Sequence, residues 1–345
     1  MTGRRVKGEP SLRKRRLVWW AGTALSGAVL LLGGWLWLQF QPLNPRTHTS
    51  TYVRITPGQS ADQIGQLLYS KKLIRSAWAF RLASLIGHQS RMLQSGVYRI
   101  TPADSPGQIL IMMERGEVVT TRVTIPEGFT VQQIVQRLVE HHIGSKKAFA
   151  SLLAHPLPGM PPASAGVRDP YEGYLFPATY QFPYGTSPQE ALLIMWQTFK
   201  ARAMALYDQS HSSVNMEQWI TLASIIQEED KNPRDAAKIS GVFANRLKRG
   251  MPLQSDATVR YALGRAVSGP LTLRDLGVHS PYNTYWHKGL PPGPICNPGM
   301  LSLKAALSPA KVPYLYFIAL PNGRTLFATT YAQQLANIRY ANQHF

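Results

Sequence analysis

The sequence predicts an α+β protein in three parts: one N-terminal helix that spans a membrane, a subdomain of short strand–helix units, and a larger α+β domain. Residues 17–40 contain no charged side chain. A pattern with two Ile residues at fixed spacing recurs three times between residues 53 and 134. The second half of the chain alternates helical and extended patterns, which is typical of an α+β domain.

The N-terminal apolar run is long enough to cross a bilayer, which takes about 20 residues. Residues 17–40 are rich in Leu, Trp, Val and Gly, with Trp near both ends, where interfacial aromatic belts lie. Residues 1–16 carry seven basic side chains against Glu9 alone, so we expect a cytoplasmic tail and translocation of the rest. A cleaved signal peptide is the alternative, but its apolar region usually spans only about 7–15 residues.

The strongly basic composition raises the question of nucleic acid, because the formal net charge is +19. The tail contributes +6 and leaves +13 on the body, which the predicted topology places outside the cytoplasm. We therefore expect no nucleic-acid partner. An anionic surface outside the cytoplasm and a general solubility role explain this charge equally well.

No cofactor or metal site is predicted. Cys296 is the only cysteine, so no intramolecular disulfide can form and we interpret it as an incidental thiol. His141 and His142 lack a Cys or Glu at ligand spacing. The chain also lacks a glycine-rich phosphate-binding loop.

An internal repeat follows the apolar run, and each copy predicts a strand, a turn and a helix. Ser60, Ser105 and Thr130 stand where they can cap the helix of their copy. In each copy, a Gln precedes the second Ile. The three copies are Val53–Ile64, Tyr98–Ile109 and Val123–Ile134.

Short strand–helix units of this kind are similar to LysM modules, which bind glycan in cell-wall proteins. We assign residues 46–160 to a LysM-like region, although units that merely space the next domain from the bilayer would look the same. Residues 156–170 are rich in Pro, Ala, Gly and Ser and have the composition of a boundary loop. The second domain is therefore assigned to residues 161–345.

Glu229 is the most informative residue of that second domain. If residues 221–230 form a helix, Glu229 falls beside Leu222 and Ile226, whereas Glu228 points away from this apolar side. A carboxyl group at the edge of an apolar surface is poorly solvated, which raises its pKa and suits it to donate a proton. Glu229 is thus a candidate general acid, with a solvated surface charge as the alternative.

The elements after Glu229 are marked by turn residues. Asn232-Pro233 is expected to end the helix of Glu229 and to open the next helix, over residues 234–249, as its N-cap and first-turn proline. That helix stops at Gly250. After Pro313, two extended runs flank the turn 321–324 and predict a hairpin. A final helix is expected from about Tyr331.

The motifs around Glu229 resemble those of the endolytic murein transglycosylase family, also called YceG-like. The similarity covers roughly the last half of the chain, with many motifs in order. These motifs are Tyr171–Tyr180, Leu222–Ile226 with Glu229, Val242–Leu247, Gly250–Val259, Tyr282–Tyr285, Gly289–Gly293, Asn297–Gly299, Ser302–Ala306 and Pro313–Phe317.

The resemblance implies an enzyme of the outer face of the bacterial inner membrane that cuts peptidoglycan glycan strands. It identifies Glu229 with the family's catalytic Glu. In such lytic transglycosylases, one Glu protonates the bond between N-acetylmuramic acid (MurNAc) and N-acetylglucosamine (GlcNAc). It then accepts the proton of the muramoyl C6 hydroxyl, leaving a 1,6-anhydro end. Gln227 and Glu228 replace the family's usual Glu and Lys, so the local charge differs.

Substrate-binding candidates come from two loops and one earlier motif. Residues 280–293 combine aromatic faces, amides and a stiff backbone, the mixture that a sugar cleft needs. A packing role for each candidate is equally consistent with the motif, and Glu172 could instead cap the turn at Gly173. The candidates are Tyr282, Asn283, Tyr285, Gln254, Ser255, Asp256 and Glu172.

Two other functions remain open: a two-carboxylate hydrolase of the same bond, and a non-catalytic glycan-binding scaffold. Past Asp275 the chain has no Asp or Glu, so a second catalytic carboxylate would come from Glu172, Glu228, Asp230 or Asp256. The resemblance also implies a single-pass inner-membrane protein with a periplasmic catalytic domain. Such a protein would terminate nascent glycan strands near peptidoglycan synthases.

Overall fold

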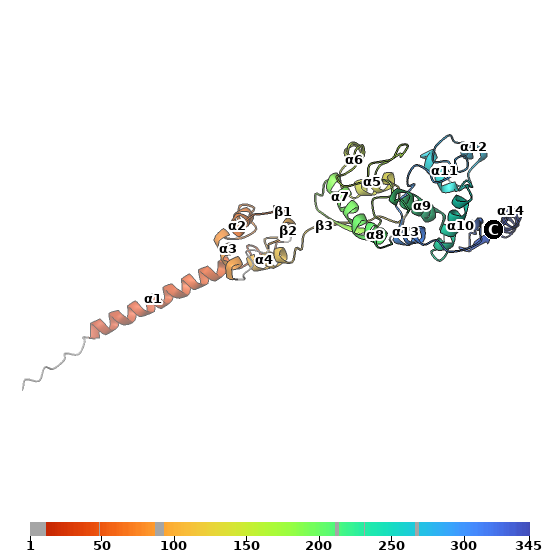
Figure 1. Ribbon diagram of the computed structural model, residues 1–345. Coiled ribbons are helices and arrows are strands. Elements are labelled where there is room, and N and C mark those ends of the chain that lie inside the picture. The colour runs from red at the N-terminus through yellow and green to blue at the C-terminus, as the bar shows by residue number, and fades with distance from the viewer. Residues whose placement is uncertain (1–11, 48, 87–92, 211–213, 231, 266–268) are drawn as a thin grey trace, which may run out of the picture. The chain divides into compact units, whose positions relative to one another are not determined.

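The computed structural model shows a mixed α+β protein (Figure 1). It describes residues 12–47, 49–86, 93–210, 214–230, 232–265 and 269–345, with the side chains of the first helix described from Ser26 onward. The chain divides into two compact units, Met1–Thr120 and Thr121–Phe345. The second unit holds Glu229.

The first unit contains a long helix and two copies of the repeat. Its elements are α1 (Leu12–Gln39), β1 (Thr51–Ile55), α2 (Ala61–Ser70), α3 (Ala77–Ile86), β2 (Gly96–Ile100) and α4 (Pro106–Glu114). Strands β1 and β2 pair antiparallel, with Val53 opposite Tyr98, and both side chains are fully buried. Among the residues that the structure describes, no helix has both the length and the apolar character required to cross a bilayer.

The second unit is mostly helical, with two small two-stranded sheets, β3–β4 and β5–β6. Helix α9 packs against α10, α11 and α13. The elements of this unit are β3 (Thr120–Thr124), α5 (Val131–Glu140), α6 (Lys146–Leu153), β4 (Thr179–Pro183), α7 (Pro188–Phe199), a π-helical segment (Lys200–Met204), α8 (Ala205–Ser210), α9 (Met216–Glu229), α10 (Ala236–Lys248), α11 (Asp256–Leu263), α12 (Leu273–Leu276), α13 (Met300–Leu307), β5 (Tyr316–Ala319), β6 (Thr325–Ala328) and α14 (Tyr331–His344).

The repeat is confirmed as strand, turn and helix in all three copies, and its recurring Gln has a structural cause. Ser60, Ser105 and Thr130 each accept a hydrogen bond from the backbone N–H of the Gln three residues later. The side chain of that Gln accepts a bond from the backbone of the capping residue. The repeat is therefore a recurring capping box, which satisfies two N–H groups at each helix start.

The third copy belongs to the second unit, so the boundary between the units lies at Thr120 and not near residue 160. Strand β3 pairs with β4, and Ile125 donates a backbone hydrogen bond to Ala178 O at 2.9 Å. On α5, Ile134 and Leu138 are fully buried in the core that also holds Trp196. Residues 156–170 were the predicted junction, but they follow elements that already pack into this core.

The elements around and after Glu229 match the predicted order, with one correction. Helix α9 ends at Glu229, but α10 begins at Ala236 with Asp235 at its N-cap. The prediction that Asn232-Pro233 opens this helix was wrong, because Asp235 N–H bonds to Asn232 O at 2.8 Å and closes a turn there. The stop at Gly250, the β5–β6 hairpin and the helix from Tyr331 are confirmed.

The capping boxes predict a local stability effect. Ser60→Ala removes the acceptor for the Gln63 N–H, and loss of such a cap costs about 1 kcal/mol. We expect the amides in the first turns of α2 to exchange with solvent about fivefold faster, as measured by hydrogen exchange with mass spectrometry. Ser60→Thr keeps the hydroxyl and should exchange like the native protein; equal exchange in Ser60→Ala would contradict the role of the cap.

Candidate active site

Glu229 lies at the C-terminal end of a helix that is buried on every side. The residues from Trp219 to Ile226 are all buried, including Thr221 and Ser224. The predicted apolar side is present, but it is not the only buried one, because α9 is packed against three other helices. Glu229 follows these buried turns and is itself half-buried. The carboxyl group is therefore anchored by a rigid helix while remaining partly accessible.

Ser255 contacts the carboxyl group of Glu229 directly. Its hydroxyl donates a hydrogen bond of 2.6 Å to Glu229 Oε1. Ser255 is buried and stands immediately before α11, whose first residue is Asp256. A short hydrogen bond from a hydroxyl favours the charged form of a carboxyl group and fixes its orientation.

Two buried threonines hold Ser255 in place. Ser255 N–H donates to Thr284 Oγ1 at 3.0 Å, and Thr258 Oγ1 donates to Ser255 O at 2.7 Å. The hydroxyl oxygens of Thr258 and Thr284 lie 2.9 Å apart and share a hydrogen bond. This network joins the loop before α11 to the loop around residue 284, so both loops support Glu229 through Ser255.

Gln254 adopts a left-handed backbone conformation (φ +53°) that is uncommon for a residue other than glycine. Its N–H donates to Thr284 O at 3.0 Å, and its side-chain oxygen accepts a bond of 2.9 Å from Arg246. The Arg246 guanidinium is buried, donates to Leu253 O and lies 5.1 Å from the centre of the Tyr316 ring. Burial lowers the pKa of Arg246.

Asp256 and Tyr285 form a second polar pair beside Glu229. The Tyr285 hydroxyl donates to Asp256 Oδ1 at 2.6 Å. Burial raises the pKa of Tyr285, and the hydrogen bond to Asp256 and the charge of Glu229 raise it further. The phenol therefore stays protonated near neutral pH. Asp256 is exposed and Tyr285 half-buried, so this pair can contact a ligand that reaches Glu229.

Tyr282 and Asn283, predicted to bind substrate, are instead buried in the protein. The Tyr282 hydroxyl accepts the Arg168 N–H at 3.2 Å, and its ring packs on Tyr261 with centroids 5.0 Å apart. Asn283 is fully buried and donates 2.9 Å bonds to the carbonyls of Leu276 and Val278. Both residues shape the loop that presents Thr284 and Tyr285.

Glu172 lies away from this group and is completely enclosed, 2 % exposed. Its carboxyl group accepts hydrogen bonds from Val131 N–H at 3.1 Å, from Asn297 Nδ2 at 3.0 Å and from the Tyr261 hydroxyl at 3.3 Å. Burial raises the pKa of Glu172 well above its usual range, and the nearby Asp169 charge raises it further. Of the two roles considered for Glu172, these contacts favour the structural one.

The thiol of Cys296, the only cysteine of the chain, is unreactive. Burial raises the pKa of Cys296 well above its usual value, and the carboxylate of Glu228 raises it further. The thiol is thus held in its protonated, unreactive form. Within the described part of the chain, no group of three or more His, Cys, Asp or Glu side chains is arranged to hold a metal ion.

Sequence reasoning missed three residues that support the site: Arg246, Thr258 and Thr284. A signal for Arg246 existed, because it stands three and seven residues after the buried Phe243 and Ile239, which places it on their side of the helix. The two threonines lie within the motifs Gly250–Val259 and Tyr282–Tyr285. Their role depends on a contact across 26 residues of chain, which spacing alone does not reveal.

Comparisons with known proteins agree with the family resemblance of the motifs and extend it over most of the chain. The sequence profile of the YceG-like family matches residues 53–340. A protein of Bacillus subtilis named endolytic murein transglycosylase is 33 % identical over 305 residues, which cover 84 % of each chain. A protein of the same name from Streptococcus pneumoniae is 27 % identical and covers 90 % of this chain, whereas the alignment spans 63 % of that protein.

A solved structure agrees with these sequence matches. The crystal structure of a YceG-like protein from Listeria monocytogenes superposes with a TM-score of 0.55 at 33 % identity, covering 84 % of this chain and 99 % of that one. The resemblance of the motifs around Glu229 is thus matched by the family profile, the relatives and the fold. The chain belongs to the YceG-like family.

Proposed function

We propose that this protein is a membrane-anchored endolytic transglycosylase that cuts the MurNAc–GlcNAc bond in nascent peptidoglycan strands. The observation that carries the proposal is the Glu229 carboxyl group, held at the end of a buried helix with Ser255 2.6 Å from it. The relatives named endolytic murein transglycosylase add independent support. Cutting growing strands inside their length would terminate glycan elongation.

Glu229 acts first as an acid and then as a base. It protonates the glycosidic oxygen as the bond to the muramoyl C1 breaks. The muramoyl C6 oxygen then closes onto C1, and its proton passes to the Glu229 carboxylate, which restores the acid. Ser255 orients the carboxyl group in both steps. Water is not consumed, and the product is a 1,6-anhydro end.

We infer that Asp256 and Tyr285 contact the substrate beside Glu229. Gln254 links the two loops that carry them, through the bond from its N–H to Thr284 O. Their 2.6 Å pair offers a carboxylate oxygen and an aromatic face to a sugar. If the enzyme were a two-carboxylate hydrolase, Asp256 would be its second catalytic carboxylate. A scaffold without activity would use the same surface for binding only.

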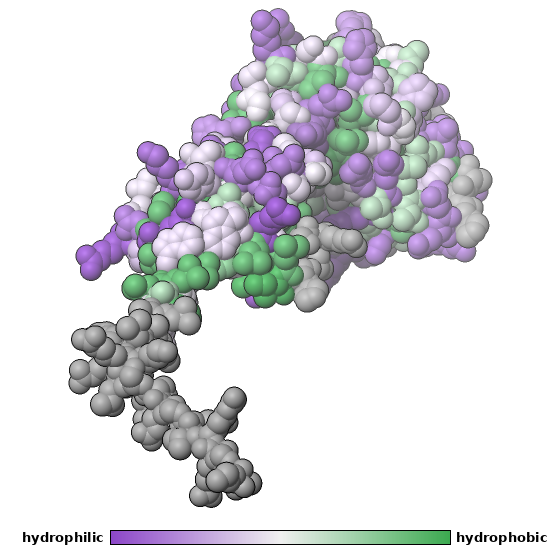
Figure 2. All heavy atoms as spheres, turned by 90° about the vertical axis from the view of Figure 1, so that its left-hand side faces the viewer, coloured by the Kyte–Doolittle hydropathy of each residue, from purple (hydrophilic) through white to green (hydrophobic). Residues whose placement is uncertain are grey.

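We infer that the protein is a single-pass inner-membrane protein with a cytoplasmic N-terminus and a periplasmic catalytic unit. The uncharged run 17–40 and the basic tail support this. Helix α3 adds an exposed apolar stripe, Trp78, Leu82, Leu85 and Ile86, at helical spacing. The Trp78 ring lies 6.2 Å from that of Trp35 on α1. In Figure 2, apolar side chains gather mainly at the lower end of the face viewed, whereas hydrophilic side chains cover most of the rest.

Peptidoglycan synthases are the protein partners that we propose. An enzyme that acts on nascent strands at the membrane surface meets its substrate where those strands emerge. The LysM-like repeats are proposed to hold glycan during this encounter.

The first test is digestion of purified peptidoglycan with residues 46–345, followed by mass analysis of the new ends. We expect 1,6-anhydro ends from the native sequence. Glu229→Gln removes the transferable proton but keeps the side-chain shape, and general acid–base catalysis is worth about 10²–10⁴-fold, so we expect a loss of at least that size. Glu228→Gln, the neighbouring matched change, should retain activity. Reducing ends would indicate a hydrolase, and binding without cleavage a scaffold.

The second test concerns Ser255. Ser255→Ala removes a hydrogen bond that favours the charged carboxylate, and such bonds to charged groups contribute about 1.5–3 kcal/mol. The alkaline limb of the pH–rate profile reports loss of the acid form, so it should move up by about one to two pH units. Ser151→Ala, an exposed position on α6, should leave the limb in place. An unchanged limb in Ser255→Ala would remove Ser255 from the mechanism.

The third test concerns the membrane anchor. The full chain, expressed in a bacterium, should remain in the membrane fraction after an alkaline carbonate wash, and a chain without residues 17–40 should not. Protease added to spheroplasts should digest the body and spare an N-terminal tag. Release of the full chain by carbonate would contradict the anchor.

A further inference from the structure

A second concave site lies in the same unit as Glu229. It is a pocket of about 570 Å³, within the range of roughly 300–1,000 Å³ typical of ligand sites. Its walls are the exposed side of α5, the loop 168–172 and the C-terminal end of α11. Neither the acid nor its hydrogen-bond partner Ser255 belongs to the lining, so the active site does not account for this pocket.

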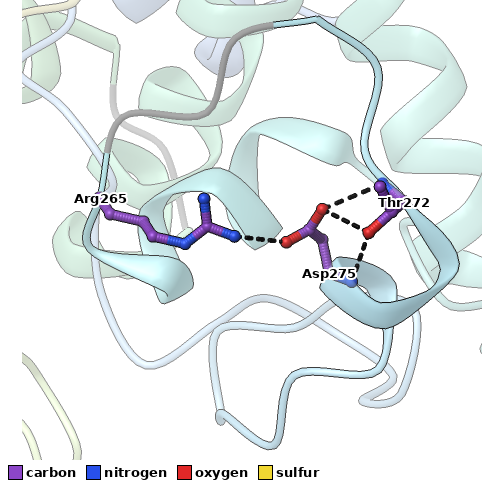
Figure 3. Close-up of polar contacts among 3 residues, drawn as sticks. All are labelled: Arg265, Thr272 and Asp275. Atoms are coloured by element: carbon purple, nitrogen blue, oxygen red, sulfur yellow. Dashed lines mark hydrogen bonds and ion pairs between the residues drawn. The ribbon is translucent and has the colours of Figure 1, made fainter.

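Four arginines line the pocket, against three carboxyl groups, of which Glu172 is buried and Glu140 lies 3.8 Å from Arg137. Arg168 donates to Tyr261 O at 2.7 Å, and its guanidinium carbon lies over the Tyr261 ring, 5.5 Å from the ring centre. A side chain at Gly264 would collide with this guanidinium. Arg265 is 60 % exposed, and its guanidinium lies 2.7 Å from Asp275 Oδ1, which orients it. The Asp275 carboxylate in turn accepts two hydrogen bonds from Thr272, one from its N–H and one from its hydroxyl (Figure 3). The four lining arginines are Arg137, Arg168, Arg260 and Arg265.

The pocket also contains groups that a simple phosphate site would not tolerate. Glu140, Asp169 and Glu172 line it, and the ionised carboxylates among them would repel a compact dianion. Gln132 and Gln136 are exposed along the same wall and can donate to and accept from peptide groups. Guanidinium, carboxylate and amide groups together complement a peptide that carries several carboxylates and an amine.

Helix α11 connects this pocket to the active site. Its first residue, Asp256, stands beside Ser255, and its other end presents Tyr261 and Gly264 to the pocket. At 1.5 Å per residue, Asp256 and Gly264 lie about 12 Å apart along the helix. One substrate molecule can therefore occupy both places.

We propose that this pocket binds the stem peptide of a muramoyl residue while Glu229 cuts the glycan, so that the enzyme selects strands that still carry their peptides. The inference rests on the proposed function, because the peptide is part of that substrate. Stem peptides carry more carboxylates than amines, which matches the excess of arginine in the pocket.

The experiment places a negative or a positive charge at one neutral position of the pocket without changing the core. Gln132 is exposed at the second position of α5, so Gln132→Glu and Gln132→Lys are both expected to fold. The full chain is given intact strands and strands stripped of peptides by an amidase. We expect a lower KM for intact strands. Gln132→Glu should raise this KM about fivefold and Gln132→Lys lower it, with kcat and the stripped-strand KM unchanged.

Gln343→Glu, an exposed site on α14 outside the pocket, is the matched control and should change neither KM. Equal KM values for the two substrates, or shifts of the same direction in both Gln132 variants, would overturn the proposal. If neither strand is cut, the proposed function fails, and titration calorimetry with the free stem tetrapeptide then decides. Binding that Gln132→Glu weakens and Gln132→Lys strengthens supports the pocket; no binding refutes it.

Discussion

The burial of α9 on all sides is the constraint on which the active site depends. Trp219 is fully buried and donates its indole N–H to Leu303 O at 2.8 Å, and Ser224 Oγ accepts the Ile295 N–H at 3.0 Å. Burying a Trp side chain contributes up to about 5 kcal/mol. A rotation or shift of α9 would lose this packing and both bonds at once. The Glu229 carboxyl group therefore has little positional freedom, and short loops suffice to complete the site.

This constraint also explains why the departures from the family pattern at Gln227 and Glu228 leave the site intact. Gln227 Oε1 accepts Gly299 N–H at 2.9 Å and Ser302 Oγ at 3.0 Å, at the start of α13. A carboxylate could accept the same two bonds, so Gln keeps the geometry and removes one negative charge. The Glu228 carboxylate lies against Gly128 and raises the pKa of the Cys296 thiol. Both side chains point into contacts other than the bond between Glu229 and Ser255.

The features that local chemistry determines could be predicted from the sequence. Those that depend on the path of a loop could not. The position of Glu229 at a helix end and the caps of the repeats follow from spacing within a few residues. Tyr282 and Asn283 could not be assigned correctly, because an aromatic or amide side chain near a catalytic motif looks the same whether it faces a ligand or the core. Its direction depends on distant contacts, such as the bond between Arg168 and Tyr282.

The third copy of the repeat has the same local structure as the first two but different partners. In the first unit, β1 and β2 pair with each other, whereas β3 pairs with β4. A capping box leaves other N–H groups at a helix start without partners, and at α5 the N–H of Val131 is taken by Glu172. The dipole of α5 and the bonds from Asn297 and Tyr261 offset part of the cost of burying this carboxyl group. Removing Glu172 would leave the Val131 N–H without this acceptor, so three distant motifs constrain one another through Glu172.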